Sequence, residues 1–227
     1  MMRALAAVAL ALVMFAGSLP PARAQERQVL PVDEAVTDAS WVQFKKRLQS
    51  AIEKRDKQFV LAILDRGVRN QGEDSAGVAE FRKQWDIDAS DSALWRELGS
   101  VMQLGAAYMK REQGPPELCA PYLLAKWPDD VEPFDHGAIV ARETTVQAEP
   151  SNSSAALGTL SYHIVSVADW EVADKASNVS QKWVRIEYRG RDGYVPEEHV
   201  RTPVEHAACF VKGPSGWRMV AFAPAGG

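Results

Sequence analysis

The residues from 86 to 97 have the types and the order that could hold a calcium ion. Positions one, three, five and twelve of this stretch are Asp86, Asp88, Ser90 and Glu97, and such positions supply oxygen ligands in helix-flanked calcium loops. The sixth position is Asp91, where the sharp turn of such a loop needs glycine. We therefore expect a helix N-cap at Ser90 or Asp91 instead of a metal site.

The other groups that could do chemistry lack a recognisable spacing. The four histidines show no zinc-like pattern; they are His136, His163, His199 and His206. The acidic stretch 129–136 could hold a cation, but a solvated loop is the expected structure. No nucleophile elbow, phosphate-binding loop or dinucleotide motif is present. The sequence thus predicts no catalytic residue, no metal and no cofactor, and we expect that the protein is not an enzyme.

The N-terminus predicts export. Residues 1–24 combine a basic start at Arg3, an apolar run over 4–16 and small residues that end at Ala24. This is the pattern of a bacterial secretory signal cleaved after Ala24. The apolar run is too short to span a bilayer comfortably, and no later segment approaches that length. We expect a periplasmic or secreted protein that does not span the membrane.

The cysteine content and the net charge narrow the possible class of protein further. Cys119 and Cys209 are the two cysteines of the chain, and an even number in an oxidising compartment is typical of a disulfide. A catalytic thiolate would need a positioned base, for which there is no local signature. The net charge is −4 and no basic block could follow a phosphate backbone, which argues against nucleic-acid binding.

The first half of the chain shows helical periodicity. Residues 25–37 form an extended lead, and 38–136 are expected to form a helix-rich N-terminal domain. Asp38 and Asp56 are candidate helix caps, further helices are expected near 78–85 and 94–104, and 118–126 resembles a short strand. Three tryptophans on these helices could line a small-ligand or hydrolase pocket, although core positions are more typical; they are Trp41, Trp85 and Trp95.

The second half shows strand patterns. Short apolar or alternating runs at 138–147, 157–167, 183–188 and 193–195 are separated by turn residues, which predicts a small barrel over 138–203. Residues 204–227 predict a C-terminal hairpin that either follows the barrel or packs back on the N-terminal domain. The expected fold is therefore α+β, with a helix-rich domain, a small barrel and a hairpin.

The stretch 183–195 predicts a hairpin in detail. Alternation places Val184, Ile186 and Tyr188 on the core face and Trp183 outward or against a neighbour. Two further expectations concern the turn: positive φ angles within a four- or five-residue loop and an aromatic pair across the strands. The residues involved are Gly190 and Gly193 for the loop, and Tyr188 and Tyr194 for the pair.

Residues 140–201 resemble the bacterial SH3 domain. The resemblance rests on Thr145-Val146-Gln147, on Ala156-Leu157-Gly158-Thr159-Leu160, on Trp183-Val184-Arg185-Ile186 and on Gly193-Tyr194-Val195. Two departures are the missing Asn and Arg of the first strand and a long insertion at 168–182. The resemblance implies an SH3-like barrel that binds peptidoglycan stem peptides or an envelope protein.

Aromatic side chains are the candidate ligand-binding residues of that barrel. Trp170, Trp183, Tyr194 and Tyr162 could form a shelf for an extended peptide. The alternative is that the indoles of Trp170 and Trp183 pack against the helical domain or the inserted loop, as large aromatic side chains usually do.

A second, weaker resemblance concerns the first half. The helix from Phe44 to Asp56 and the final segment from Gly216 to Met219 are similar to the nuclear-transport-factor-like fold. This resemblance implies that the last hairpin returns to the first domain. The bridge between Cys119 and Cys209 would then join a strand within 118–126 to one within 208–212.

Overall fold

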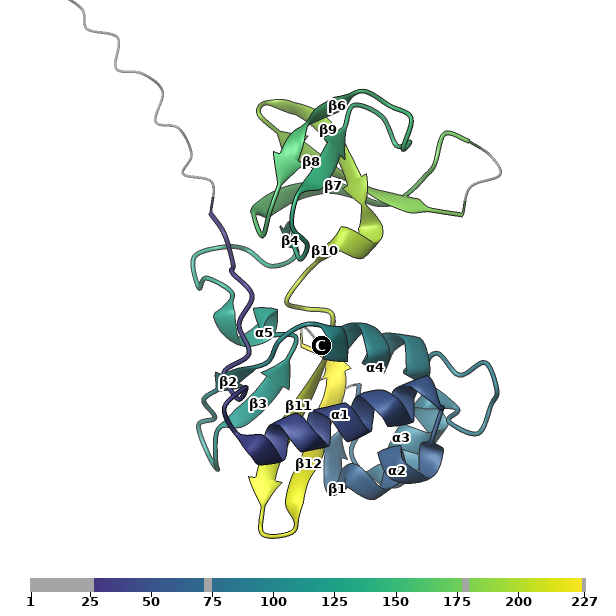
Figure 1. Cartoon of the computed structure of the whole chain (residues 1–227), viewed down its shortest axis with the longest axis vertical. Coiled ribbons are helices and arrows are strands. Elements are labelled where there is room, and N and C mark those ends of the chain that lie inside the picture. The colour runs from purple at the N-terminus through teal and green to yellow at the C-terminus, as the bar shows by residue number, and fades with distance from the viewer. Residues whose placement is uncertain (1–26, 72–74, 177–179, 226–227) are drawn as a thin grey trace, which may run out of the picture.

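The computed structural model describes residues 27–71, 75–176 and 180–225, and Figure 1 shows two β-sheets arranged along the long axis of the molecule. The predicted signal sequence, 1–24, lies outside the described residues. Helices cover one sheet, whereas the other sheet has strands and one short 3₁₀ turn.

Five α-helices lie in the described residues: α1 (Ala39–Glu53), α2 (Lys57–Ile63), α3 (Val78–Trp85), α4 (Leu94–Gln103) and α5 (Leu123–Lys126). The expected caps form, because Asp38 accepts a hydrogen bond from Ser40 N and Asp56 accepts one from Phe59 N. None of the described helices combines the length and the apolar character needed to cross a membrane.

The first sheet contains strands from both ends of the chain. Its order is β1 (Leu64–Arg69), β12 (Gly216–Pro224), β11 (His206–Gly213), β3 (Glu117–Ala120) and β2 (Ala107–Met109). β1 runs parallel to β12, and the other neighbours are antiparallel. The C-terminal hairpin therefore occupies the middle of this sheet.

One face of the first sheet carries α1 to α4 and the largest core. Side chains alternate along β11, so Ala208 and Phe210 point into the helical layer while Ala207 and Cys209 lie on the opposite face. Trp41 of α1 is completely buried and its ring centroid lies 5.3 Å from that of Phe210. The helices thus pack against the first sheet through their apolar faces.

The expected fold class is wrong. The described residues form two sheets with twelve strands and five small helices, so the protein is mostly β and lacks a helix-rich domain followed by an SH3-like barrel. The physical reason is that β1 and β3 are short and take β12 and β11, which are distant in sequence, as their partners. Helical periodicity was visible locally, whereas these long-range partners left no local pattern.

Two segments differ from their predicted type. The helix expected to end near Gly67 ends at Ile63, and β1 follows with no intervening turn. The strand predicted over 118–126 continues only to Ala120, after which α5 forms.

The second sheet has seven strands and lies between β3 and β11 in the sequence. Its order is β10 (Val200–Arg201), β4 (His136–Ile139), β7 (Ile164–Ala173), β8 (Lys182–Tyr188), β9 (Arg191–Pro196), β5 (Thr144–Gln147) and β6 (Ala156–Leu160). A 3₁₀ turn, η1 (Glu197–His199), precedes β10. Val184, Ile186 and Tyr188 lie in its apolar core, as alternation predicted. Much of the expected insertion at 168–182 is strand, because β7 continues to Ala173.

The turn of the β8–β9 hairpin is tighter than expected. Only Arg189 and Gly190 connect the strands, with φ angles of 54° and 79°, the signs required by a two-residue type I′ turn. Tyr188 pairs with Arg191, and Tyr194 pairs with Arg185, so the predicted tyrosine pair is absent. The loop has two residues in place of the expected four or five, and this change in length moves every cross-strand partner.

The predicted disulfide is confirmed. Cys119 of β3 and Cys209 of β11 are direct partners across antiparallel strands, with Cα atoms 4.1 Å apart. The bond closes a loop with a sequence separation of 90 residues, which contains the entire second sheet.

Replacing Gly193 with alanine should destabilise the second sheet. A Cβ atom there would lie 2.5 Å from Val146 Cγ1 and 3.1 Å from Tyr188 Cβ. We expect a loss of about 1–3 kcal/mol in the free energy of unfolding, measured in urea. Gly67→Ala is the control, because its nearest atom would lie at an ordinary 3.6 Å. Equal stability of the two variants would contradict the packing described here.

Removing both cysteines should lower the stability of the whole chain. In the Cys119→Ala/Cys209→Ala variant we expect a loss of about 2–4 kcal/mol in the free energy of unfolding, since the loop is long. Urea titration of wild type with and without reductant gives the matched comparison. A reduced wild type as stable as the oxidised form would contradict this role of the bond.

Candidate binding cleft between the two sheets

A cleft of about 620 Å³ lies where α4 of the first half meets η1 and β10 of the second. Its wall contains one tryptophan, five glutamates and two arginines; these are Trp170, Glu97, Glu171, Glu197, Glu198, Glu205, Arg96 and Arg201. We call this the intersheet cleft. Its volume is within the range of small-ligand sites, and its charge is predominantly negative.

Arg201 connects the two halves beside the intersheet cleft. It is 8% exposed, and its Nη1 lies 3.3 Å from Ser100 Oγ on α4 while its Nη2 donates to the carbonyl oxygen of His206 at 2.8 Å. Its Nη1 also lies 3.6 Å from the Glu205 carboxylate. Arg201 therefore fixes the position of β10 relative to α4.

Two glutamates of the cleft, Glu197 and Glu205, have a raised pKa. Burial raises the pKa of Glu205 above its ordinary value, and the Arg201 guanidinium opposes the rise. Burial, followed by the charge of Glu171, raises the pKa of Glu197. Both carboxylates would be stabilised by an added positive charge, because a nearby cation favours the ionised form.

His206 lies next to this region, on the side of the helical core. Its ring centroid lies 5.2 Å from that of Trp85 and 5.6 Å from that of Phe222. Burial lowers the pKa of His206, while the charge of Glu97 opposes the shift. The neutral imidazole is thus favoured, and the net charge of the region stays negative.

The four candidate ligand-binding aromatics do not form one shelf. Trp170 lines the intersheet cleft. Trp183 is completely buried, and its indole N–H donates to Asp174 at 2.9 Å, as the packing alternative expected. Tyr194 lies on β9 opposite Arg185, and Tyr162 contacts Arg142. Of the four, Trp170 has a place in a cleft with charged partners.

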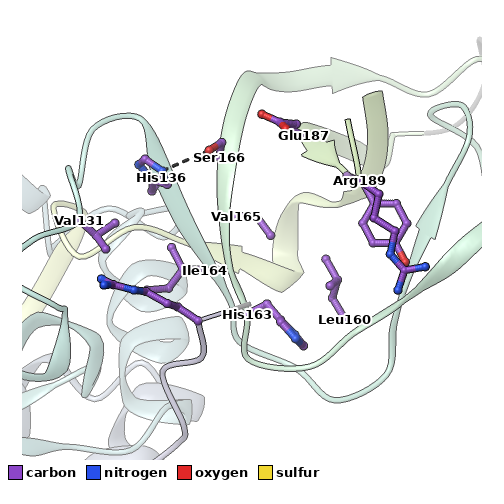
Figure 2. A pocket seen from close by; sticks show the side chains of 11 residues that line it. Val131, His136, Leu160, His163, Ile164, Val165, Ser166, Glu187 and Arg189 are labelled. Atoms are coloured by element: carbon purple, nitrogen blue, oxygen red, sulfur yellow. Dashed lines mark hydrogen bonds between the residues drawn. The ribbon is translucent and has the colours of Figure 1, made fainter. Parts of the chain in front are cut away.

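A second groove, of about 670 Å³, follows β7 near β4 and β6. Figure 2 shows His136 hydrogen-bonded to Ser166 at its rim; the other ring nitrogen of His136 lies 2.9 Å from the carbonyl oxygen of Glu132. A serine beside a histidine resembles a nucleophile and its base. The histidine is oriented here by a backbone carbonyl, and the pair is exposed, so we assign no catalysis to it.

The calcium-like stretch forms no calcium loop. The carboxylate oxygens of Asp88 lie 2.6 Å from Lys57 Nζ and 2.9 Å from Arg82 Nη2. Neither expected cap is used: α4 starts after Ala93, and Leu94 N donates to Ser92 Oγ instead. Two basic side chains therefore occupy the ligand oxygens that Ca²⁺ would need.

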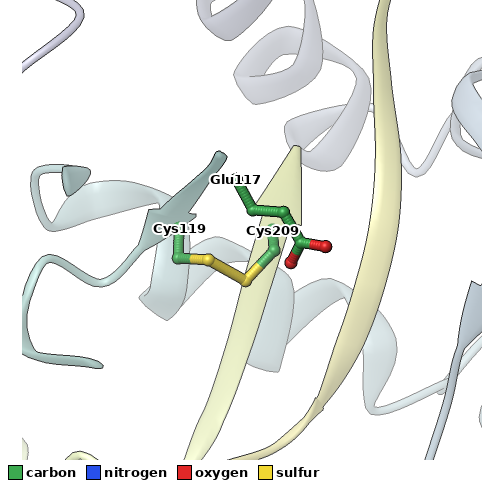
Figure 3. Close-up of side chains that lie close together, drawn as sticks. All are labelled: Glu117, Cys119 and Cys209. Atoms are coloured by element: carbon green, nitrogen blue, oxygen red, sulfur yellow. A yellow bond between two sulfur atoms is a disulfide. The ribbon is translucent and has the colours of Figure 1, made fainter. Parts of the chain in front are cut away.

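One group of potential metal ligands comes together in the described residues. Glu117, Cys119 and Cys209 have ligand atoms within 4.8 Å of one another. Figure 3 shows that both sulfur atoms belong to the disulfide. Cysteine binds a metal as the thiolate, and a disulfide offers none, so this group does not favour a metal site.

The tryptophans considered for a pocket in the first half are core residues. Trp41, Trp85 and Trp95 are 0%, 8% and 7% exposed and belong to the apolar cluster under the helices. The ring centroids of Trp85 and Phe222 lie 4.8 Å apart in a stacked arrangement. This filled core does not support a ligand pocket around these indoles.

No family model, no curated protein and no solved structure matches the chain. The resemblance of residues 140–201 to bacterial SH3 domains, and that of the first half to the nuclear-transport-factor-like fold, therefore stay predictions. The intersheet cleft has to be interpreted from its own residues.

Sequence reasoning missed the glutamates of the cleft. They come from four separate parts of the chain: α4, β7, η1 and the segment before β11. Only the adjacent Glu197 and Glu198, after a proline, form a local signal. The other three glutamates come close to them only because strands that are distant in sequence pair with each other.

The raised pKa of Glu205 predicts a specific pH dependence. The folded state binds this proton more tightly than the unfolded state, so the stabilisation by proton binding is complete below the unfolded pKa and disappears as pH rises through the folded pKa. Relative to wild type, Glu205→Gln should gain stability as pH rises through that window. Urea unfolding of both proteins from about pH 4 to pH 8 measures this; a constant stability difference would contradict it.

Proposed function

We propose that the protein is a non-catalytic binding protein of the cell envelope, and that its intersheet cleft takes a peptidoglycan stem peptide with a free side-chain amine. The observation that carries the proposal is the position of Trp170 among five glutamates in one cleft. The resemblance of 140–201 to bacterial SH3 domains is consistent with such a ligand.

The charged side chains of the cleft suit a short peptide that carries both an ammonium group and a carboxylate. Glutamates would accept hydrogen bonds from an ammonium group, and an indole face attracts a cation. Arg96 lies on the same wall, 79% exposed, where its guanidinium could bind a peptide carboxylate. A ligand with one amine and one carboxylate would therefore find partners for both.

The disulfide supports a location in an oxidising compartment. Cys119 and Cys209 are bonded, and such bonds persist in oxidising environments. We extend this to the periplasm or the exterior as part of the proposal, following the signal pattern at 1–24.

A hydrolase in the first half is not favoured. The cavity that would have supported it, around Trp41, Trp85 and Trp95, is filled by their own side chains.

The proposal predicts that a muropeptide with a free amine binds at the intersheet cleft. In an NMR titration, amide shifts should gather around Trp170, Glu198 and Arg201. Trp170→Ala should weaken binding roughly tenfold, through the lost contact with the cation. Because Trp170 also packs against the second sheet's core, Glu198→Lys, at an exposed wall residue, provides a second test with an expected loss of similar size.

Two control variants show whether the loss of affinity is specific to residues of the cleft. Phe134→Ala removes an aromatic that is 63% exposed outside the cleft, and Glu53→Lys reverses a charge on α1; both should bind like wild type. A muropeptide with its amine acetylated should bind more weakly. Absence of shifts at about 10 mM muropeptide, or binding unaffected by Trp170→Ala and Glu198→Lys together, would reject the proposal.

A further inference from the structure

The face of the first sheet opposite α1 to α4 carries a separate cavity of about 390 Å³. Its apolar wall contains Cys209 of the disulfide, Met109, Leu124 and mostly small side chains, among them three alanines of β11 and β12: Ala207, Ala221 and Ala223. We call it the disulfide-face cavity. Longer side chains at the three alanines would fill it, so the space depends on their small size.

A buried carboxylate with two arginines lies beside this cavity. The side chain of Glu117 is 7% exposed; one of its oxygens lies 2.6 Å from Arg69 Nη2, and the other lies 3.5 Å from Arg111 Nε. Glu117, near the sulfur atoms in Figure 3, thus shares its charge between two guanidinium groups. The three side chains together carry a net positive charge.

Both arginines keep capacity for another anion. Their side chains are 40% and 39% exposed and both line the cavity. A guanidinium has five N–H donors in a planar arrangement, and the ion pairs to Glu117 involve one nitrogen of Arg69 and one of Arg111. The remaining N–H groups suit a carboxylate, which guanidinium groups often bind through two parallel hydrogen bonds.

Asn70 adds an unsatisfied acceptor to the same cavity. It is 4% exposed and lines the wall. Its amide nitrogen donates to the Gly77 carbonyl oxygen at 3.1 Å, while its Oδ1 is buried without a hydrogen-bond partner among the described residues. A buried acceptor left unpaired costs free energy, which a ligand N–H or O–H would recover.

We propose that the disulfide-face cavity binds a small carboxylic acid that also carries an amide N–H or a hydroxyl group. The carboxylate binds Arg69 and Arg111, the donor pairs with Asn70 Oδ1, and a short apolar part lies over the alanines and the disulfide. This site is independent of the proposed function, because none of its lining residues lines the intersheet cleft.

N-acetyl-alanine is the probe that tests this proposal, since it combines a carboxylate, an amide N–H and a methyl group. In an NMR titration of the oxidised full chain, we expect saturable shifts at Asn70, Arg111 and Ala223 with a Kd below about 10 mM. Its methyl ester lacks the carboxylate charge and propionate lacks the donor, so each should bind at least several-fold more weakly.

Three variants locate the site. Arg111→Gln leaves Glu117 paired with Arg69 and should weaken binding about tenfold. Ala223→Leu should abolish binding by filling the cavity, at a position that is only partly buried. Arg66→Gln, an exposed arginine of the same sheet outside the cavity, should bind like wild type.

Several results would overturn the proposal. These are the absence of saturable shifts, binding of the methyl ester as strong as that of the acid, and binding unchanged in both Arg111→Gln and Ala223→Leu. Shifts around Trp170 instead would assign the acid to the intersheet cleft and equally reject this site.

Discussion

The pairing of β3 with β11 is the contact on which the other arrangements depend. It brings Cys119 next to Cys209 and places the two ends of the long segment between β3 and β11 side by side. Everything in the second sheet lies between these ends. Because the chain leaves and returns at adjacent strands, β10 comes to lie against α4, and the Arg201 contacts with Ser100 and the His206 carbonyl fix that approach.

The two faces of the first sheet carry side chains of different size. Toward the helices the strands present large apolar groups such as Phe210 and Phe222, which are completely buried. Toward the other face they present alanines and the disulfide. Large side chains provide most of the apolar burial, whereas small ones leave a cavity. Strand alternation alone produces this difference within one sheet.

Local physical signals made part of this structure predictable. Capping carboxylates at Asp38 and Asp56 and alternation at Val184 and Ile186 are properties of neighbouring residues, and they were interpreted correctly. The five-stranded sheet left no such local signal, because β1 and its partner β12 lie far apart in the sequence. Only the weaker resemblance of the first half implied that the last hairpin returns there. The wall of the intersheet cleft depends on the same long-range pairing, so of the predicted aromatics only Trp170 lies there.

The position of the C-terminal hairpin has a consequence for how the chain is made. β11 and β12 lie within the first sheet, yet they follow all the other described strands in the sequence. Chains emerge from the N-terminus, so α1 to α4 and the whole second sheet are complete while β1 and β3 still lack the strands that join them. During this interval the apolar faces of the helices have no sheet to cover them. Maturation without aggregation therefore depends on how rapidly β11 and β12 emerge and pair, since exposed apolar surface and unpaired strand edges promote aggregation.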